Sequence, residues 1–136
     1  MAIFNISVQP AKNRSPIERY DYVLRIGKYS PENNKDKYDD FLYGENINMP
    51  SFSQKDPRYF WECSEVYERV NANLFRTIDF SLPYELSDKE NIELAKKFAK
   101  ELFGESYVYS LAVHSKPSSD PDKRNIHCHI MFYERE

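Results

Sequence analysis

Hydrophobic side chains recur at every second position in parts of this chain, which is the spacing typical of β-strands. Near the N-terminus, Phe4, Ile6 and Val8 follow this spacing, and polar residues stand between them. Four later segments also have strand-like sequence, one of them within a long polar stretch. The segments that we expect to form strands are residues 2–8, 75–82, 107–114 and 125–133. Residues 29–56 are expected to form a long, exposed loop region that contains a short strand or hairpin near residues 41–47.

Three other segments space their hydrophobic residues three and four positions apart, as amphipathic helices do. Ser15 followed by Pro16 favours a helix start, because the serine side chain can cap the helix and proline fits its first turn. Ser87 and Glu90 have the spacing of a capping box. The expected helices are residues 15–27, 56–74 and 87–104.

The order of these elements predicts a single α+β domain over residues 1–136, a length sufficient for one hydrophobic core. We expect an antiparallel β-sheet with the helices packed on one face and polar side chains gathered on the other. The polar face would carry alternate strand residues, namely Asn5, Ser7, Thr77, Asp79, Ser81, Ser110, His114, His127 and His129. This face is the candidate site.

The composition is that of a soluble globular protein, since 40% of the residues are hydrophobic and 30% are charged. No uninterrupted apolar run is long enough for a membrane span, and the N-terminus lacks the pattern of a secretory signal. We therefore expect a cytoplasmic protein. Its two cysteines, Cys63 and Cys128, do not make a disulfide framework, and we expect both to be reduced and buried.

Charge is distributed unevenly along the chain. The net charge of −3 argues against binding nucleic acid through overall charge alone. Residues 1–37, however, hold seven Lys or Arg against four Asp or Glu, so their net charge is +3. The 11 Tyr and 9 Phe can fill a core or stack on unpaired bases. A local basic surface is therefore compatible with an acidic chain.

All three histidines of the chain lie between positions 114 and 129. His127 and His129 are two residues apart on one expected strand, so their side chains project from the same face. If the last two strands form an antiparallel hairpin, His114 lies close to His127. Three converging imidazoles would bind one divalent metal ion and leave coordination positions open for water or a phosphate oxygen.

The segment around these histidines reads NIHCHIMFYER at residues 125–135, and AVH precedes it at residues 112–114. Both resemble the histidine motif of the MobA/MobL-type plasmid relaxases, which belong to the histidine-hydrophobic-histidine (HUH) endonucleases. Further matches follow in the family's order along nearly the whole chain. They are YVLRIGKY at residues 22–29, NMP at 48–50, the FW…E…ER.N pattern at 60–71 and SLPYEL at 81–86.

The resemblance implies an enzyme that nicks one DNA strand at an origin of transfer. A tyrosine oxygen would attack the scissile phosphorus, and a divalent ion on the three histidines would withdraw charge from the phosphate. The protein would stay attached to the 5′ phosphate through a phosphotyrosine bond. The implied partners are single-stranded DNA and accessory relaxosome proteins. The ligand set leaves Mn, Mg, Zn and Ni open as the metal.

Two tyrosines of the first expected helix compete for the role of nucleophile. At 100° per residue, Tyr20 lies on the buried stripe, whereas Tyr22 lies on the polar face with Glu18 and Arg25. The family's motif also aligns with Tyr22. We therefore assign the nucleophile to Tyr22 and expect Tyr20 in the core.

A carboxylate is expected beside one ligand histidine, because such a partner orients the ring and raises its basicity. Relatives in the family are expected to carry an acid where this chain has Thr77, so the sequence departs from the pattern there. Asp79, two residues further on the same face, is the preferred candidate. Glu65 and Glu68 on the preceding helix are the alternatives, and Ile126 stands where the family's motif has proline.

Two groups of basic residues lie near the expected site in the sequence. One group surrounds Tyr22, and the other lies around the loop between the last two strands. Both groups could contact DNA phosphates. They consist of Lys12, Arg14, Arg25 and Lys28, and of Lys116, Lys123 and Arg124.

Two other functions stay open at this point. A rolling-circle replication initiator or a transposase would use the same chemistry, although a tyrosine near the N-terminus favours a relaxase. A catalytically idle, truncated DNA-binding module is the second alternative, because the chain ends at Glu136, soon after the last histidine.

Overall fold

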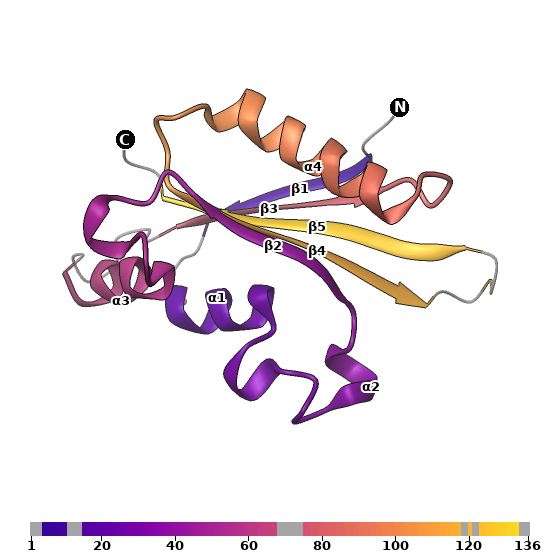
Figure 1. Cartoon of the computed structure of the whole chain (residues 1–136), viewed down its shortest axis with the longest axis horizontal. Coiled ribbons are helices and arrows are strands. Elements are labelled where there is room, and N and C mark those ends of the chain that lie inside the picture. The colour runs from indigo at the N-terminus through magenta and orange to yellow at the C-terminus, as the bar shows by residue number, and fades with distance from the viewer. Residues whose placement is uncertain (1–3, 11–14, 68–74, 118–119, 121–122, 134–136) are drawn as a thin grey trace.

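A computed structural model describes residues 4–10, 15–67, 75–117, 120 and 123–133 of the chain. Within these residues, a five-stranded antiparallel sheet carries helices on both of its faces (Figure 1). The strands are β1 (Phe4–Pro10), β2 (Phe41–Ile47), β3 (Arg76–Leu82), β4 (Tyr109–Pro117) and β5 (Arg124–Phe132). The helices are α1 (Pro16–Leu24), α2 (Lys35–Tyr38), α3 (Pro57–Tyr67) and α4 (Asp88–Phe103), with short 3-10 turns at Gly27–Tyr29 and Ser51–Ser53. The α+β class, the four expected strands and the short strand near residues 41–47 are confirmed, whereas α2 lies in a stretch that was expected to be a loop.

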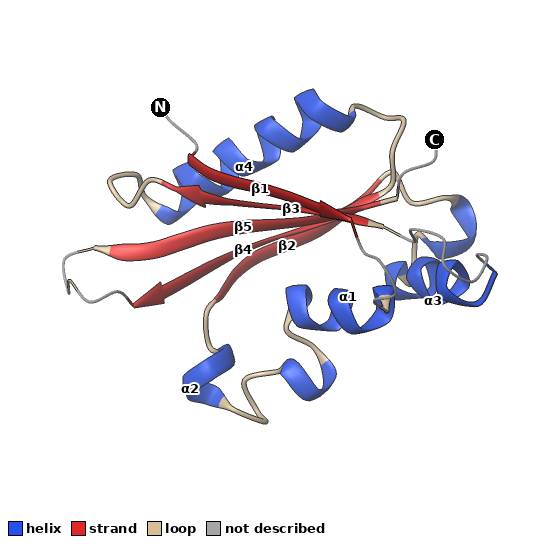
Figure 2. Cartoon of the chain, turned by 180° about the vertical axis from the view of Figure 1, so that it is seen from behind, coloured by secondary structure: helices blue, strands red, loops and turns tan. Residues whose placement is uncertain are grey.

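The strands lie side by side in the order β1-β3-β5-β4-β2, which places β5 at the centre of the sheet (Figure 2). The expected hairpin of β4 and β5 is present, and His114 lies directly opposite His127 in its register. On its other side β5 pairs with β3, where Asp79 lies opposite His129. The candidate residues therefore stand on paired central strands, whose backbone hydrogen bonds hold their relative positions.

Helices cover both faces of the sheet, which corrects the expectation that they pack on one face (Figure 1). On the first face, Ala95, Ala99 and Phe103 of α4 pack against strand residues such as Phe80 and Ile130. This cluster is the larger core of the protein and follows the hydrophobic half of the strand alternation.

The face that was expected to be open and polar holds a second, smaller core at one end. Tyr20 of α1 and Trp61 of α3 pack there with Phe75 and Met131, and all four are buried. The indole N–H of Trp61 donates to the hydroxyl of Ser110 at 3.1 Å. Because this bond satisfies a polar strand residue under a helix, the polar alternation did not require an uncovered face.

The buried side of α3 does not include Cys63, which was expected to be buried. Trp61 and Ser64 are buried, whereas Cys63 is only partly buried. The prediction of two buried thiols is therefore wrong for Cys63 and confirmed for Cys128, and both thiols are free. The expected end of the helix, at residues 68–74, lies outside the described residues.

Apolar side chains stay partly exposed along the edge of the sheet. Ile6 and Val8 of β1 are 51% and 53% exposed, and Leu102 of α4 is 51% exposed. An edge strand has a neighbour on one side only, so its apolar face is covered less completely than the sequence alternation suggests. None of the described helices is long and apolar enough to cross a bilayer.

Candidate functional site

The three histidines form a row on the face of the sheet that also carries α1. The ring centroids of His114 and His129 are 4.6 Å apart, and those of His129 and His127 are 6.3 Å apart. Their common face follows from the register, since His114 is paired with His127 and His129 is two residues further along β5. The hairpin therefore gathers the histidines as the sequence predicted.

His129 is held by Asp79. The Nδ1 atom of His129 lies 2.6 Å from Oδ1 of Asp79, and because a carboxylate accepts, Nδ1 carries the proton. The lone pair of Nε2 then stays available to another partner. Arg19 donates to the same oxygen of Asp79 at 3.2 Å. Arg19 was not predicted from the sequence, although its place one helical turn before Tyr22 was a usable signal.

His114 is the innermost histidine, only 1% exposed, and both of its ring nitrogens face protein groups. Nε2 lies 2.7 Å from the carbonyl oxygen of Val23, so this nitrogen donates. Nδ1 lies 3.3 Å from Nη2 of Arg25 and accepts from it. Burial lowers the pKa of His114 to about 3, and the neighbouring His129 and Arg25 act in the same direction. The ring is therefore neutral at physiological pH.

His127 lies at the more exposed end of the row, next to the start of β5. Burial lowers the pKa of His127, and His129 and Lys116 act in the same direction. A neutral imidazole is the form that binds divalent metal ions. His127 thus has the protonation state that a metal ligand needs.

The three imidazoles fit a divalent metal ion by their chemistry, but their placement fits it only in part. His127 and His129 lie on the accessible part of the row, whereas His114 would have to give up its hydrogen bond to Val23. In the described part of the chain, no group of three or more His, Cys, Asp or Glu side chains is arranged to hold a metal ion. The three-histidine ligand set predicted from the sequence is therefore not preformed.

Tyr22 lies on α1 with two arginines against its ring. The Cζ atom of Arg25 is 4.5 Å from the ring centroid, and that of Arg19 is 5.5 Å away. Each arginine also reaches the histidine row, because Arg25 contacts His114 and Arg19 contacts Asp79. Tyr22 is therefore connected to His114 and Asp79 through these two arginines, while Tyr20 is buried as expected.

A pocket of about 270 Å³ opens next to Tyr22 and also contains Tyr29. The two rings pack edge to face, with centroids 5.2 Å apart. The hydroxyl of Tyr29 donates to Glu18 at 2.9 Å, and this bond raises the pKa of Tyr29. Tyr29 was not predicted from the sequence as a site residue. It is a second phenol in the pocket, but its hydroxyl proton is hydrogen-bonded to Glu18.

Arg25 is buried, with 5% of its surface exposed, so it does not present the DNA contact that the sequence predicted. Its Nε and Nη2 donate to the two carboxylate oxygens of Asp40 at 2.8 and 3.0 Å. Its Nη1 donates to the carbonyl oxygen of Tyr22 at 2.6 Å. Burial alone would lower the pKa of Arg25, but the bonds with Asp40 raise it. The guanidinium is thus a buried structural cation.

Arg25 also ends helix α1, in an uncommon backbone conformation. Arg25 adopts a left-handed conformation with φ of 56° and ends α1 before Gly27, the expected stop. A residue with a side chain pays about 1 kcal/mol or more for this conformation. The buried ion pair with Asp40 offsets that cost, so the chain leaves α1 directly after the turn that carries Tyr22.

Of the basic residues predicted around Tyr22, Lys28 is exposed and pairs with Glu18 at 2.8 Å. Such a surface ion pair is weak, so Lys28 can leave Glu18 and bind a phosphate instead. Lys12 and Arg14 lie outside the described residues. The contact of this group with DNA stays a prediction.

The second basic group lies at the end of the β4–β5 hairpin where the loop joins the two strands. The Nζ atom of Lys116 is 3.7 Å from Asp40, and its side chain is 46% exposed. Arg124 donates to the hydroxyl and the carbonyl oxygen of Ser115 at 2.6 and 3.0 Å. Lys123 stands just before β5 and is exposed. These cations border the end of the histidine row that His127 occupies.

Comparison with known proteins shows the family of this chain. The model of the MobA/MobL family matches residues 25–136. The chain belongs to the MobA/MobL family. The resemblance seen in the sequence motifs is thereby confirmed. The match includes all three histidines and Asp79, whereas Tyr22 lies just before its first residue.

Two relatives of this MobA/MobL chain match over nearly its whole length. The 43 kDa relaxation protein of Salmonella typhimurium is 33% identical over 135 residues, which are 99% of this chain and 35% of that protein. Mobilization protein A of Escherichia coli is 34% identical over 139 residues, covering 99% of this chain and 18% of that protein. The chain thus spans well under half the length of either relative.

A solved structure shares the fold of this chain. It is described as "Molecular Basis of Vancomycin Resistance Transfer in Staphylococcus aureus", and it superposes with a TM-score of 0.73 at 24% sequence identity. The similarity covers 99% of this chain and 72% of the other. The five-stranded sheet with helices on both faces is therefore an arrangement found in an independently solved protein.

Proposed function

We propose that this MobA/MobL chain nicks single-stranded DNA at an origin of transfer and becomes linked to it through Tyr22. The observation that carries the proposal is the position of the Tyr22 ring against Arg25 and Arg19, which contact His114 and Asp79. A phenol, two cations and a row of imidazoles are thus brought together from α1, β3, β4 and β5. This combination suits attack on a phosphodiester.

In the proposed step, the phenolic oxygen of Tyr22 forms a bond to phosphorus while the bond from phosphorus to the 3′ oxygen breaks. The phenolic proton leaves and the departing 3′ oxygen gains a proton, so the number of protons bound overall is unchanged. The product is a 5′-phosphotyrosine diester, and the reverse step rejoins the strand. Because one diester replaces another, the step needs no external energy source.

The residues around Tyr22 have separate tasks in this proposal. Asp79 holds the ring of His129 with the proton on Nδ1, which directs Nε2 to the substrate side. Arg19 places positive charge near the phenol and near Asp79. A divalent ion bound by His127 and His129, with His114 as the third ligand, would supply charge that stabilises the pentacovalent phosphate.

The proposal also includes the DNA contacts of the chain and its protein partners on the plasmid. Four exposed cations would contact phosphates on either side of the cut linkage, namely Lys28, Lys116, Lys123 and Arg124. Relaxosome proteins would present the origin in single-stranded form. A rolling-circle initiator or transposase would use the same chemistry, but no described feature favours either over the relaxation and mobilization proteins that resemble this chain.

Covalent capture tests the proposal directly. The chain is incubated with a fluorescent single-stranded DNA pool that has a central random stretch, in the presence of Mn²⁺, and resolved on a denaturing gel. The proposal predicts a protein band that carries the fluorophore and a released strand with a free 3′ hydroxyl. Binding of the pool without any such adduct would instead support the catalytically idle DNA-binding module.

A further inference from the structure

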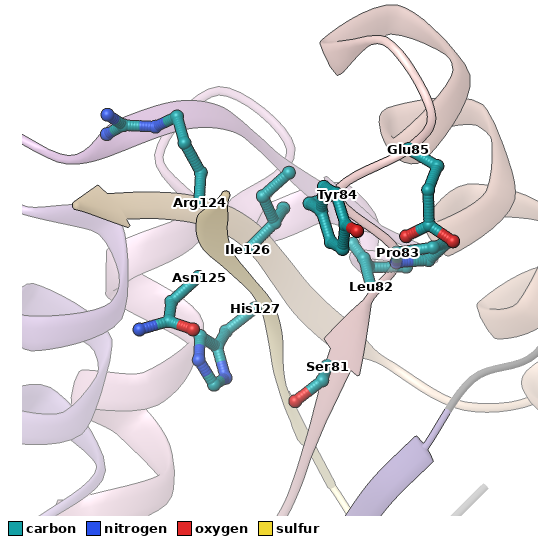
Figure 3. A pocket seen from close by; sticks show the side chains of 9 residues that line it. All are labelled: Ser81, Leu82, Pro83, Tyr84, Glu85, Arg124, Asn125, Ile126 and His127. Atoms are coloured by element: carbon teal, nitrogen blue, oxygen red, sulfur yellow. The ribbon is translucent and has the colours of Figure 1, made fainter. Parts of the chain in front are cut away.

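A larger pocket of about 450 Å³ opens between the end of β3 and the start of β5 (Figure 3). Its volume lies in the range that small-molecule sites occupy. Its wall includes Ser81, Tyr84, Glu85, Asn125 and His127. The pocket therefore begins at the exposed end of the histidine row, and one of the candidate metal ligands forms part of its wall.

The strand register explains why this pocket adjoins the site. Ser81 lies directly opposite His127 in the pairing of β3 with β5. Asn125 is two residues before His127 on the same strand, so both side chains extend from the same face. Figure 3 shows the side chains of Asn125 and His127 next to each other on one side of β5. A group bound in the pocket would therefore lie next to His127, at one end of the histidine row.

We propose that this pocket binds the base of a nucleotide next to the scissile linkage of single-stranded DNA; this inference rests on the proposed nicking function. Tyr84 follows β3 and is 43% exposed, so it offers an aromatic surface to the pocket. Ser81 and Asn125 offer a hydroxyl and an amide that can donate and accept. Stacking and edge hydrogen bonds are the two contacts by which an unpaired base is held.

The charges around the pocket favour a neutral base over a phosphate as its occupant. The carboxylate of Glu85 lies in the wall and would repel an anion. The guanidinium of Arg124 is directed to Ser115 by two hydrogen bonds. The Nζ atom of Lys123 lies 5.3 Å from the centroid of the Tyr84 ring, where it can reach a backbone phosphate of the same nucleotide. The base would enter the pocket and its phosphate would stay at the rim.

The test compares base preferences of Tyr84→Ala with those of a matched control. Tyr59→Ala is the control, because Tyr59 of α3 is 46% exposed, close to the value for Tyr84, but does not line the pocket. Each protein is equilibrated with the random single-stranded DNA pool without added metal, and the bound strands are sequenced. Melting temperatures verify that both variants fold like the wild-type protein.

We expect wild type and Tyr59→Ala to enrich the same bases at the same positions. Tyr84→Ala should lose the preference at one position only and bind the enriched sequence about tenfold more weakly. Asn125→Ala should change the base preferred at that same position, because it alters the edge contacts and leaves the stacking surface. With Mn²⁺ present, sequencing of covalently captured strands should place this position within one or two nucleotides of the cut.

Identical profiles for Tyr84→Ala and Tyr59→Ala would overturn the inference, as would a lost position far from the cut. If the wild-type protein shows no base preference but forms adducts, the pocket inference fails and the nicking proposal stands. If no adduct forms, but Tyr84→Ala still erases one position, the nicking proposal fails and the pocket remains a base-binding site.

Discussion

The Nδ1 atom of His129 donates to Oδ1 of Asp79 at 2.6 Å, and the two residues lie directly opposite each other in β5 and β3. The sheet register thus brings the carboxylate to the ring without help from a loop. Thr77, at the position where an acid was expected, is buried and two residues away on the same strand face. Because side chains two residues apart on a strand share a face, an acid at position 79 lies on the same face of the sheet as an acid at position 77 would.

Asp79→Asn should weaken metal binding by about 10- to 100-fold and slow adduct formation, while the melting temperature changes little. The amide keeps the shape of the side chain but no longer stabilises the proton on Nδ1 of His129. Titration calorimetry with Mn²⁺ measures the affinity. Asp88→Asn, at the exposed start of α4, is the matched control and should bind like wild type. Equal affinities for both variants would refute the role given to Asp79.

The buried pair of Arg25 and Asp40 should be important for stability, since their side chains are 2% and 5% exposed. Arg25→Leu leaves the Asp40 carboxylate buried without its main partner and should cost about 3 to 5 kcal/mol in the free energy of unfolding. The double variant Arg25→Leu/Asp40→Leu removes both charges and should recover much of this loss. Urea unfolding provides the measurement.

A loss below about 1 kcal/mol for Arg25→Leu, together with weaker DNA binding, would contradict this account. It would indicate that Arg25 turns outward in solution and contacts phosphates, as the sequence alone suggested.

Replacement of His114 or His127 by alanine should affect the stability of the fold differently but should weaken metal binding in both cases. His114→Ala removes the ring that the carbonyl oxygen of Val23 accepts from and one of the contacts of the Arg25 guanidinium, which should cost about 1 to 3 kcal/mol even without metal. His127→Ala, at the more exposed end of the row, should unfold close to wild type. Both should bind Mn²⁺ more weakly than wild type. Unchanged Mn²⁺ affinity in His127→Ala would exclude this residue as a ligand.

The two thiols should differ in reactivity. Burial raises the pKa of Cys128, which is 0% exposed, so iodoacetamide should modify it only after unfolding. Cys63 is partly exposed and should react slowly in the native protein. Mass spectrometry of native and denatured samples counts the modified residues. Equal native reactivity of both cysteines, or a disulfide between them, would contradict the structure.

Local patterns were sufficient to predict the longer helices, the strands and the histidine row, but not the short helix α2. Alternation along β5 puts His127 and His129 on one face, and the hairpin with β4 brings His114 opposite His127. The capping residues Ser15 and Ser87 also mark helix starts that the structure contains. These features depend on neighbours in sequence or on the simplest strand connection, so a single sequence carries their signal.

Contacts between distant elements could not be predicted in the same way. The hydrogen bond of Trp61 to Ser110 lets α3 cover a polar part of the sheet, and the contact of His114 with Val23 packs α1 against β4. Neither bond has a sequence pattern, because each depends on how a helix is placed over the sheet. Arg25 illustrates the result, since a cation on a polar helix face became a buried partner of Asp40.

The central claim is that Tyr22 is the residue that becomes linked to DNA. Tyr29→Phe removes a hydroxyl from the same pocket, and Tyr20→Phe removes one from the buried core, so both serve as matched controls for Tyr22→Phe. Each variant is incubated with Mn²⁺ and a labelled strand that wild type captures, and the adduct is quantified on a denaturing gel. The account predicts that Tyr22→Phe forms no adduct yet still binds the strand, while Tyr29→Phe and Tyr20→Phe both form it. An adduct that persists in Tyr22→Phe and disappears in either control would contradict the account.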